Sequence, residues 1–301
     1  MKKYRIYQID AFTQKRFEGN PAGVVANADG LTDAQMQAIA RELNNAETAF
    51  ILSPTGDDHD VRVRFFTPTT EVPSCGHATI SAHYVRAMEQ NLSSCTVLQR
   101  IGIGVLPVDV VGLGDNRKIV MTQGRVEISE PFGDSLKGEI IRALNLSASD
   151  LDKRCPIQIV STGHSKVMIG IKKRCVLNEL QPDLTALAEI SQKIACHGYF
   201  VFTFDSNSQE ILTYGRMFAP SIGIAEDPVT GNANGPLGAY IVHHKLRDVP
   251  IDGTYAFQAK QGEAMKRPGI VDVTVEVVNG KPVKVQVGGF AAIAFQTEIE
   301  I

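Results

Sequence analysis

The chain has 301 residues, of which 44% are hydrophobic and 21% are charged, and its formal net charge is −3. This composition is ordinary for a soluble globular protein, and the length suits two domains of about 150 residues each. The sequence has no Lys/Arg-rich run with interleaved aromatic residues, so nucleic acid is not an expected partner.

The hydrophobic pattern and the cysteine content indicate the compartment. No apolar run approaches the ~20 residues that a membrane span needs, and the first residues lack the apolar core of a signal peptide. The five cysteines are odd in number and include no Cys-x-x-Cys spacing, so we predict neither a disulfide framework nor a zinc site. We therefore expect a cytoplasmic protein with reduced thiols, no metal and no membrane partner.

The first half is predicted to be rich in antiparallel strands. Thr32 and Gln35 form a capping box ahead of a helix that ends at Asn44, a residue type that tolerates a left-handed backbone. Alternating apolar residues predict strands over 4–12, 47–52 and 61–66, and further strands within 96–111.

The second half repeats this plan. A helical pattern through Leu187, Ile190 and Ile194 leads directly into a strand that begins at Gly198. Apolar runs predict the other strands over 157–160, 166–171, 272–277 and 283–295. A shift of roughly 150 residues superimposes this helix on the first-half helix and brings Gly198 close to Glu47. The first half has a carboxylate at this position and the second half has none.

An internal duplication explains this repetition. Residues 71–78 and 226–233 both read Glu-x-Pro-x-x-Gly-(His/Asn)-Ala, and each is preceded by Arg-x-Phe-x-Pro, at 64–68 and 216–220. Order, spacing and residue type agree twice. We predict a first domain over 1–118, with which the C-terminal strand near 290–301 can pack, and a second domain over 119–301.

The Gly-polar-Ala turns at Gly76 and Gly231 each open into a helical run. The first amides of a helix lack intrahelical acceptors and carry partial positive charge, and glycine allows a ligand close to that backbone. We therefore expect the two helix starts to hold one small anion, such as a carboxylate, in a cleft between the domains.

Several side chains near these turns can carry chemistry. Glu47 begins an apolar strand, and a partly buried carboxyl group there is a competent acid or base; the alternative is a solvated glutamate after a helix. His77 can donate to an anion or transfer a proton, and otherwise it caps the helix. Asp227 can bind a substrate amine or hydroxyl group, or cap the second helix. Asn232 can position a ligand but cannot move protons.

Cys75 is a candidate nucleophile or base if the helix start favours its thiolate, but small buried cysteines are common. Its counterpart in the second half is Thr230, which cannot form a thiolate. The sequence contains neither a dinucleotide-binding Gly-x-Gly-x-x-Gly after a strand, nor a phosphate-binding P-loop, nor Gly-x-Ser-x-Gly. Cofactor-free acid/base chemistry is therefore the favoured interpretation.

These motifs, in this order, resemble the PhzF phenazine-biosynthesis isomerase family from Tyr4 to near the C-terminus. The segments that carry the resemblance are 19–21, 47–50, 64–68, 71–79 and 226–231. The resemblance implies an α+β fold of the diaminopimelate-epimerase type. In that fold, two pseudo-symmetric domains each wrap a mostly antiparallel sheet around a central helix, with the active site between them. It also implies a homodimer.

The family's site residues carry over by position. Glu47 matches the catalytic acid/base, His77 and Asp227 match residues that line the substrate pocket, and Gly76 and Gly231 match the backbone turns. Asn232 departs from the phenazine enzyme, which is similar but has serine there, so the substrate of that enzyme, dihydro-hydroxyanthranilate, is not carried over.

We therefore predict a cofactor-independent isomerase that moves a proton on a small carboxylate substrate, with Glu47 as the acid/base. A single base suits a proton shift on one face of the substrate, whereas inversion of a stereocentre normally needs bases on both faces. The alternatives are an amino-acid racemase or epimerase that uses Cys75, and a catalytically silent protein that binds small anions.

Overall fold

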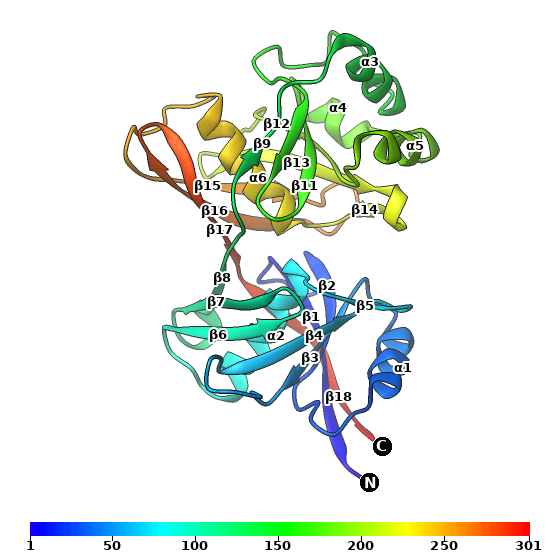
Figure 1. The fold of residues 1–301 in the computed structure, drawn as a ribbon, viewed down its shortest axis with the longest axis vertical. Coiled ribbons are helices and arrows are strands. Elements are labelled where there is room, and N and C mark those ends of the chain that lie inside the picture. The colour runs from blue at the N-terminus through cyan, green and yellow to red at the C-terminus, as the bar shows by residue number, and fades with distance from the viewer. The chain divides into compact units, whose positions relative to one another are not determined.

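The computed structural model describes residues 1–301, with residue 115 described by its backbone alone (Figure 1). The chain forms two compact units. The first contains Met1–Thr122 and Gly288–Ile301, and the second contains Gln123–Val287. Each unit combines many short strands, most of them paired antiparallel, with a few helices, in agreement with the predicted α+β class.

The first unit holds most of its strands in one connected ladder. β1 pairs antiparallel with β2 and β18, β2 runs parallel to β3, and β3 runs antiparallel to β4. β4 pairs antiparallel with β5 and parallel with β6, and the series β6, β7, β8 is antiparallel. The strands are β1 (Lys3–Ala11), β2 (Asn20–Val25), β3 (Thr48–Leu52), β4 (Val61–Phe66), β5 (Glu71–Val72), β6 (Cys95–Ile101), β7 (Gly104–Val111), β8 (Lys118–Thr122) and β18 (Ala291–Glu300).

The helices of this unit are α1 (Asp33–Leu43), α2 (Gly76–Glu89) and the short η1 (Gly114–Asn116). The predicted capping box is present: the Gln35 amide donates to Thr32 Oγ1 at 3.3 Å, and the Thr32 amide donates to Gln35 Oε1 at 2.8 Å. α1 ends at Asn44, which has φ 52° as predicted. α2 is the central helix, since its small and apolar side chains are almost all buried and it packs against β1, β2 and β3.

The second unit repeats the ladder. β10 runs antiparallel to β9 and β11, β11 runs parallel to β12, and β12 runs antiparallel to β13. β13 then pairs antiparallel with β14 and parallel with β15, which is antiparallel to β16. The strands are β9 (Glu127–Ile128), β10 (Gln158–Ser161), β11 (Ser165–Ile171), β12 (Tyr199–Thr203), β13 (Ile211–Ala219), β14 (Ile224–Asp227), β15 (Gly253–Gln261), β16 (Gly269–Val278) and β17 (Lys281–Gly289).

Its helices are α3 (Asp134–Ala143), α4 (Arg174–Glu179), α5 (Leu184–Ile194), α6 (Gly231–His243) and the short η2 (Pro220–Ile222). α6 is the central helix: Leu237, Ile241 and Val242 are fully buried. Glycine lets it approach the sheet closely, because a Cβ at Gly238 would lie 2.7 Å from a Val273 methyl group. In this unit the sequence analysis did not predict α3, α4, β13 or β15, nor the short strands β9 and β14.

The duplication is visible in side-chain contacts as well as in topology. Arg64 forms a two-pronged ion pair with Glu71, with Nε and Nη2 each 2.7 Å from a carboxylate oxygen. Arg216 forms the same pair with Glu226, at 2.8 and 2.7 Å. Such planar pairs fix geometry as well as charge. In each unit the pair ties a strand of the ladder to the short strand that leads into the central helix.

Candidate functional site

Glu47 lies directly before β3, where its backbone is held by the neighbouring strand. The Gly23 amide donates to the Glu47 carbonyl at 3.3 Å, next to the parallel pair of Gly23 and Thr48. The Glu47 side chain is 16% exposed, and its Oε2 lies 3.3 Å from Nε2 of His77. The structure therefore places the predicted acid/base group in a largely buried position beside a second group that can exchange protons.

His77 is the second residue of α2 and is buried. Each ring nitrogen of its imidazole contacts a different group. Nε2 faces Glu47, and Nδ1 lies 3.5 Å from Sγ of Cys75. The Nε2 contact has the distance of an ion pair but not the geometry of a hydrogen bond. Carboxylate, imidazole and thiol thus lie together in the first unit.

Among the residues that the structure describes, these three side chains form a group that could hold a metal ion. Glu47, Cys75 and His77 each offer one donor atom, and the three atoms lie within 4.8 Å of one another. Carboxylate, thiolate and imidazole are donors that zinc accepts. However, the thiol lies at Nδ1 and the carboxylate at Nε2, and one ion can use only one ring nitrogen. An ion held by all three groups would therefore use a single nitrogen of the imidazole, and the same contacts also allow proton exchange among the three groups.

The start of α2 has no side-chain cap among the described residues. Cys75 is the N-cap residue, with extended backbone (φ −152°, ψ 126°), and its side chain makes no capping hydrogen bond within the described residues. Gly76 is the first helical residue. The Thr79 amide and hydroxyl group both donate to the Cys75 carbonyl, at 3.1 and 2.7 Å. This fixes the first turn while the amide end keeps its partial positive charge.

The start of α6 repeats this geometry. Thr230 is the N-cap residue and Gly231 the first helical residue, and the Asn234 amide and side chain donate to the Thr230 carbonyl at 3.1 and 2.9 Å. The Thr230 hydroxyl donates to the buried Asp227 carboxylate. The buried side chain of Gln261 fixes this turn. Its Nε2 donates to the Asp227 carbonyl at 2.8 Å, and its Oε1 accepts from the Thr230 backbone amide at 3.0 Å.

A residue that the sequence analysis missed orients Asn232. The Gln123 Nε2 group donates to Asn232 Oδ1 at 3.0 Å and to the Gly231 carbonyl at 3.3 Å. Thr162 in turn donates to Gln123 Oε1 at 2.6 Å. Gly235 makes room for this side chain, because a Cβ there would lie 2.6 Å from Gln123 Cδ. Gln123 is more than a hundred positions from Asn232 in the sequence and lies outside every motif, so no local pattern predicts its role.

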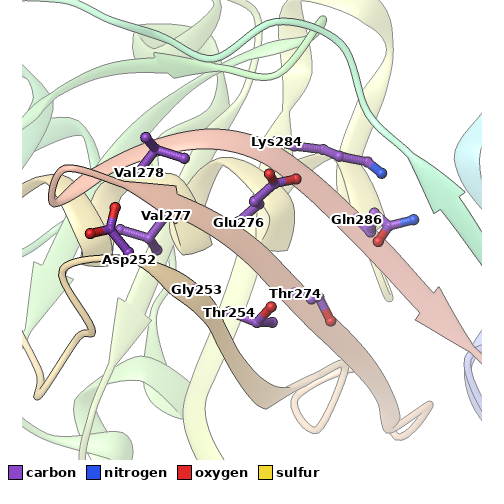
Figure 2. Close-up of a pocket in the computed structure, with 9 residues that line it drawn as sticks. All are labelled: Asp252, Gly253, Thr254, Thr274, Glu276, Val277, Val278, Lys284 and Gln286. Carbon is purple, nitrogen blue, oxygen red and sulfur yellow. The ribbon is translucent and has the colours of Figure 1, made fainter.

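The predicted site residues therefore form two groups. Glu47, Gly76 and His77 lie in the first unit, and Asp227, Gly231 and Asn232 lie at the start of α6 in the second. A hollow of about 360 Å³ on β15, β16 and β17 contains none of them (Figure 2). Its lining is polar and largely exposed, with Glu276 and Lys284 from adjacent strands.

Among the described residues, no helix is long and apolar enough to cross a membrane.

Comparison with known proteins then decides the family. The sequence profile of the family described as "Phenazine biosynthesis-like protein" matches residues 9–297. The chain belongs to this family. Its relatives in the phenazine biosynthesis-like family include an uncharacterised isomerase of Clostridium acetobutylicum, 56% identical over 299 residues, which cover 99% of both chains. The uncharacterised isomerase YddE of Escherichia coli is 48% identical over 297 residues, 98% of each chain. The resemblance stated from the motifs is confirmed, and so is the prediction of an isomerase.

A family member of named activity is more distant. The trans-2,3-dihydro-3-hydroxyanthranilate isomerase of Pseudomonas aeruginosa is 28% identical over 289 residues, 96% of each chain. Among solved structures, the phenazine biosynthesis protein of Bacillus anthracis superposes with a TM-score of 0.88 at 29% identity, over all of both chains. A hydroxyproline epimerase of Agrobacterium vitis gives 0.64 at 11% identity over 99% and 92% of the chains, which shows the fold alone. The predicted epimerase-like fold is confirmed.

Proposed function

We propose that this protein is a cofactor-independent isomerase that moves a proton on a small carboxylate substrate, with Glu47 as the acid/base. The observation that carries the proposal is the contact between Glu47 Oε2 and His77 Nε2 at 3.3 Å. The carboxylate is largely buried and stands beside a group that can exchange a proton with it. Positioned acid/base groups of this kind typically contribute about 10²–10⁴-fold to a rate.

In the proposed reaction, the ionised Glu47 carboxylate takes a proton from a carbon next to a carbonyl or conjugated system. The C–H bond breaks, and an O–H bond forms on Glu47. The same carboxyl group then returns the proton to another carbon of the conjugated system, on the same face. Because Glu47 ends as it began, no oxidant, reductant or metal is needed to balance the reaction.

Substrate recognition in this proposal uses the two helix starts and Asn232. Gln123 donates to Oδ1 of Asn232 and so fixes which end of this side-chain amide is the donor, and in this proposal Nδ2 donates to an anionic oxygen of the substrate. The amide ends at Gly76 and Gly231 favour negative charge for the same reason that other helix starts do. His77 and Asp227 complete the set as a donor and an acceptor for the substrate.

The named activity of the Pseudomonas aeruginosa relative supports this class of reaction, since it is an isomerisation of a cyclic carboxylate. At 28% identity it supports the class of chemistry and not the identity of the substrate. The substrate class that we propose is therefore a small carboxylate with an acidic C–H bond. As in the family resemblance, we expect a homodimer, which light scattering after gel filtration tests.

A second candidate is an epimerase that uses Cys75. The contact between Cys75 Sγ and His77 Nδ1 favours it, because a thiol beside an imidazole can form a reactive thiolate. Its weakness is the second unit, where Thr230 occupies the corresponding N-cap position.

The experiment is proton exchange in heavy water. The protein is incubated in D₂O with a pool of trans-2,3-dihydro-3-hydroxyanthranilate, trans-4-hydroxy-L-proline and L-proline, and ¹H NMR follows loss of carbon-bound protons. Exchange that forms a constitutional isomer supports the proposal, and exchange with inversion at a stereocentre supports the epimerase. No exchange in this pool or in a wider screen of small carboxylates that bind would refute both.

A further inference from the structure

In the second unit, Gly198 stands at the position of Glu47, and the side chain of Lys166 fills the space above it. Each position is defined by a pair of parallel strands: the Gly23 amide donates to the Glu47 carbonyl, and the Val167 amide donates to the Gly198 carbonyl at 2.8 Å. The residues that follow are paired in the same way, since Thr48 is opposite Gly23 and Tyr199 is opposite Val167. Gly198 is therefore the backbone counterpart of Glu47.

The preceding helices give the same correspondence. α1 ends at Asn44 with φ 52°, and α5 ends at Ala195 with φ 51°. Glu47 and Gly198 each stand three residues after this left-handed residue. Two independent features, strand register and helix end, thus place Glu47 and Gly198 at one position of the repeated fold.

The space left by the missing side chain at Gly198 is filled by Lys166. A Cβ at Gly198 would overlap Lys166 Cδ and lie 2.8 Å from Cε and 3.5 Å from Nζ. The lysine stem therefore runs directly over the Gly198 backbone. Its Nζ donates to the Ser165 carbonyl at 3.2 Å. An amine thus stands in the second unit at the place from which a carboxylate extends in the first.

We propose that Lys166 is a second proton-transfer residue of this enzyme, acting as a general acid toward an oxygen of the substrate while Glu47 removes the carbon-bound proton. This inference rests on the proposed function. As the C–H bond breaks, negative charge develops on the adjacent oxygen. An Nζ–H bond of the Lys166 ammonium breaks and an O–H bond forms. When Glu47 returns its proton to carbon, the oxygen returns the other to the amine.

The surroundings of Lys166 suit this role. Burial lowers the pKa of its amine below the ordinary value of 10.5, while Cys196 and Asp227 act in the opposite direction. Burial and the Lys166 charge lower the pKa of His164, which also interacts with this amine. An ammonium with a lowered pKa gives up its proton more readily, which is what a general acid near neutral pH requires. Asp227 also belongs to the predicted substrate-binding group at the start of α6.

The first test needs no substrate. Competitive acetylation with acetic anhydride across a pH series, read by peptide mass spectrometry, reports the titration of individual lysines. Lys172 is the matched control, since it follows the same strand, is exposed, and donates from Nζ to the Ser149 carbonyl. Lys166 should titrate at lower pH than Lys172, and Asp227→Asn should lower its midpoint further. Equal titration midpoints for Lys166 and Lys172 would overturn the proposal. So would a complete lack of acetylation at Lys166, because an amine that the reagent cannot reach is not available to a substrate.

The second test uses deuterium exchange with the carboxylates of the pool. Lys166→Met should lower the rate at saturation by about 10²-fold, and Lys172→Met should not change it. Lys166→Arg keeps the charge but not a transferable proton, so it should remain as slow as Lys166→Met. Gly198→Ala should slow exchange because it displaces the amine without removing it. Circular dichroism and thermal melting establish that each variant is folded.

The outcomes separate this proposal from the proposed function. If Glu47→Gln abolishes exchange and Lys166→Met does not, the isomerase assignment stands and the second proton-transfer residue is wrong. If Lys166→Arg exchanges at the wild-type rate while Lys166→Met does not, the lysine acts by charge alone and the proposal is wrong. If the wild-type protein exchanges no carboxylate proton, the proposed function fails and the role of Lys166 in it fails too, whatever the labelling shows of its titration.

Discussion

Replacement of Glu47 by glutamine tests the mechanism most directly. Glutamine keeps the volume of the side chain and a hydrogen-bonding oxygen, and Glu47 is largely buried with its Oε2 3.3 Å from His77 Nε2. The substitution therefore leaves no cavity and retains a partner for the imidazole. The contact it weakens is a single one, and we expect a change in unfolding free energy within about 1.5 kcal/mol.

The effect on the reaction should be far larger. An amide cannot accept a carbon-bound proton, so the whole contribution of the acid/base group is lost. For a sole proton shuttle we expect the upper end of the usual range, about 10⁴-fold in rate. At about 1.36 kcal/mol for each tenfold change, this corresponds to roughly 5 kcal/mol of barrier. Substrate affinity should stay near that of the wild-type protein, because the binding groups are unchanged.

The assay is deuterium incorporation from D₂O, measured at saturating substrate, alongside binding by calorimetry. Glu42→Gln is the matched control. This substitution makes the same chemical change five residues away, on the exposed side of α1. It should exchange at the wild-type rate. If Glu47→Gln also exchanges within tenfold of wild type, Glu47 has a structural role and the assignment of the acid/base is wrong.

The other predictions use the same assays. Cys75→Ala should keep at least a tenth of the wild-type rate if the thiol only packs; a folded variant that loses about 10³-fold would revive the epimerase. Gly76→Val and Gly231→Val should each abolish carboxylate binding in a thermal-shift titration while the protein stays folded, and unchanged affinity in either would contradict anion binding at both helix starts. Gln123→Leu should weaken carboxylate binding about tenfold, since Asn232 loses the donor that orients its amide, and an unaltered dissociation constant would count against that role. Prolonged dialysis against EDTA should leave the exchange rate unchanged, whereas loss of activity that zinc restores would assign Glu47, Cys75 and His77 to a metal.

Much of the fold follows from local patterns in the sequence. The capping box at Thr32 and the end of α1 at Asn44 depend on residues within one or two turns, and both are present as predicted. α3 has no comparable signal, because its N-cap residue is Gly133, which has no side chain to cap the helix. β15 was missed because its alternation is weak, with only Ala259 and Gln261 buried on that strand.

The candidate site divides in the same way. The two helix starts are marked by a short motif that recurs in both halves, and Glu47 is marked by its place at the start of an apolar strand. Gln123 and Gln261 are not, because each reaches its partners only after strands far apart in the sequence have paired. The contact of His77 with Glu47 also depends on how the edge of β3 meets α2. Such contacts are set by packing, which no local pattern encodes.

The duplication offers a reason why Glu47 has no carboxylate counterpart. Both units keep the Arg–Glu ion pair and a central helix whose N-cap side chain makes no capping hydrogen bond within the described residues. A second carboxylate at Gly198 would place another negative charge near Asp227, and like charges raise the cost of ionising each other. A lysine whose stem covers Gly198 instead brings a cation to the same place. In our proposal the two units share one backbone frame, and the proton chemistry is divided between a carboxylate and an amine. The double substitution Gly198→Glu with Lys166→Ala would replace the amine by a second carboxylate. We expect this double variant to fold but to bind carboxylates more weakly than wild type in the thermal-shift titration; equal or tighter binding would show that the sign of the charge at this place is immaterial.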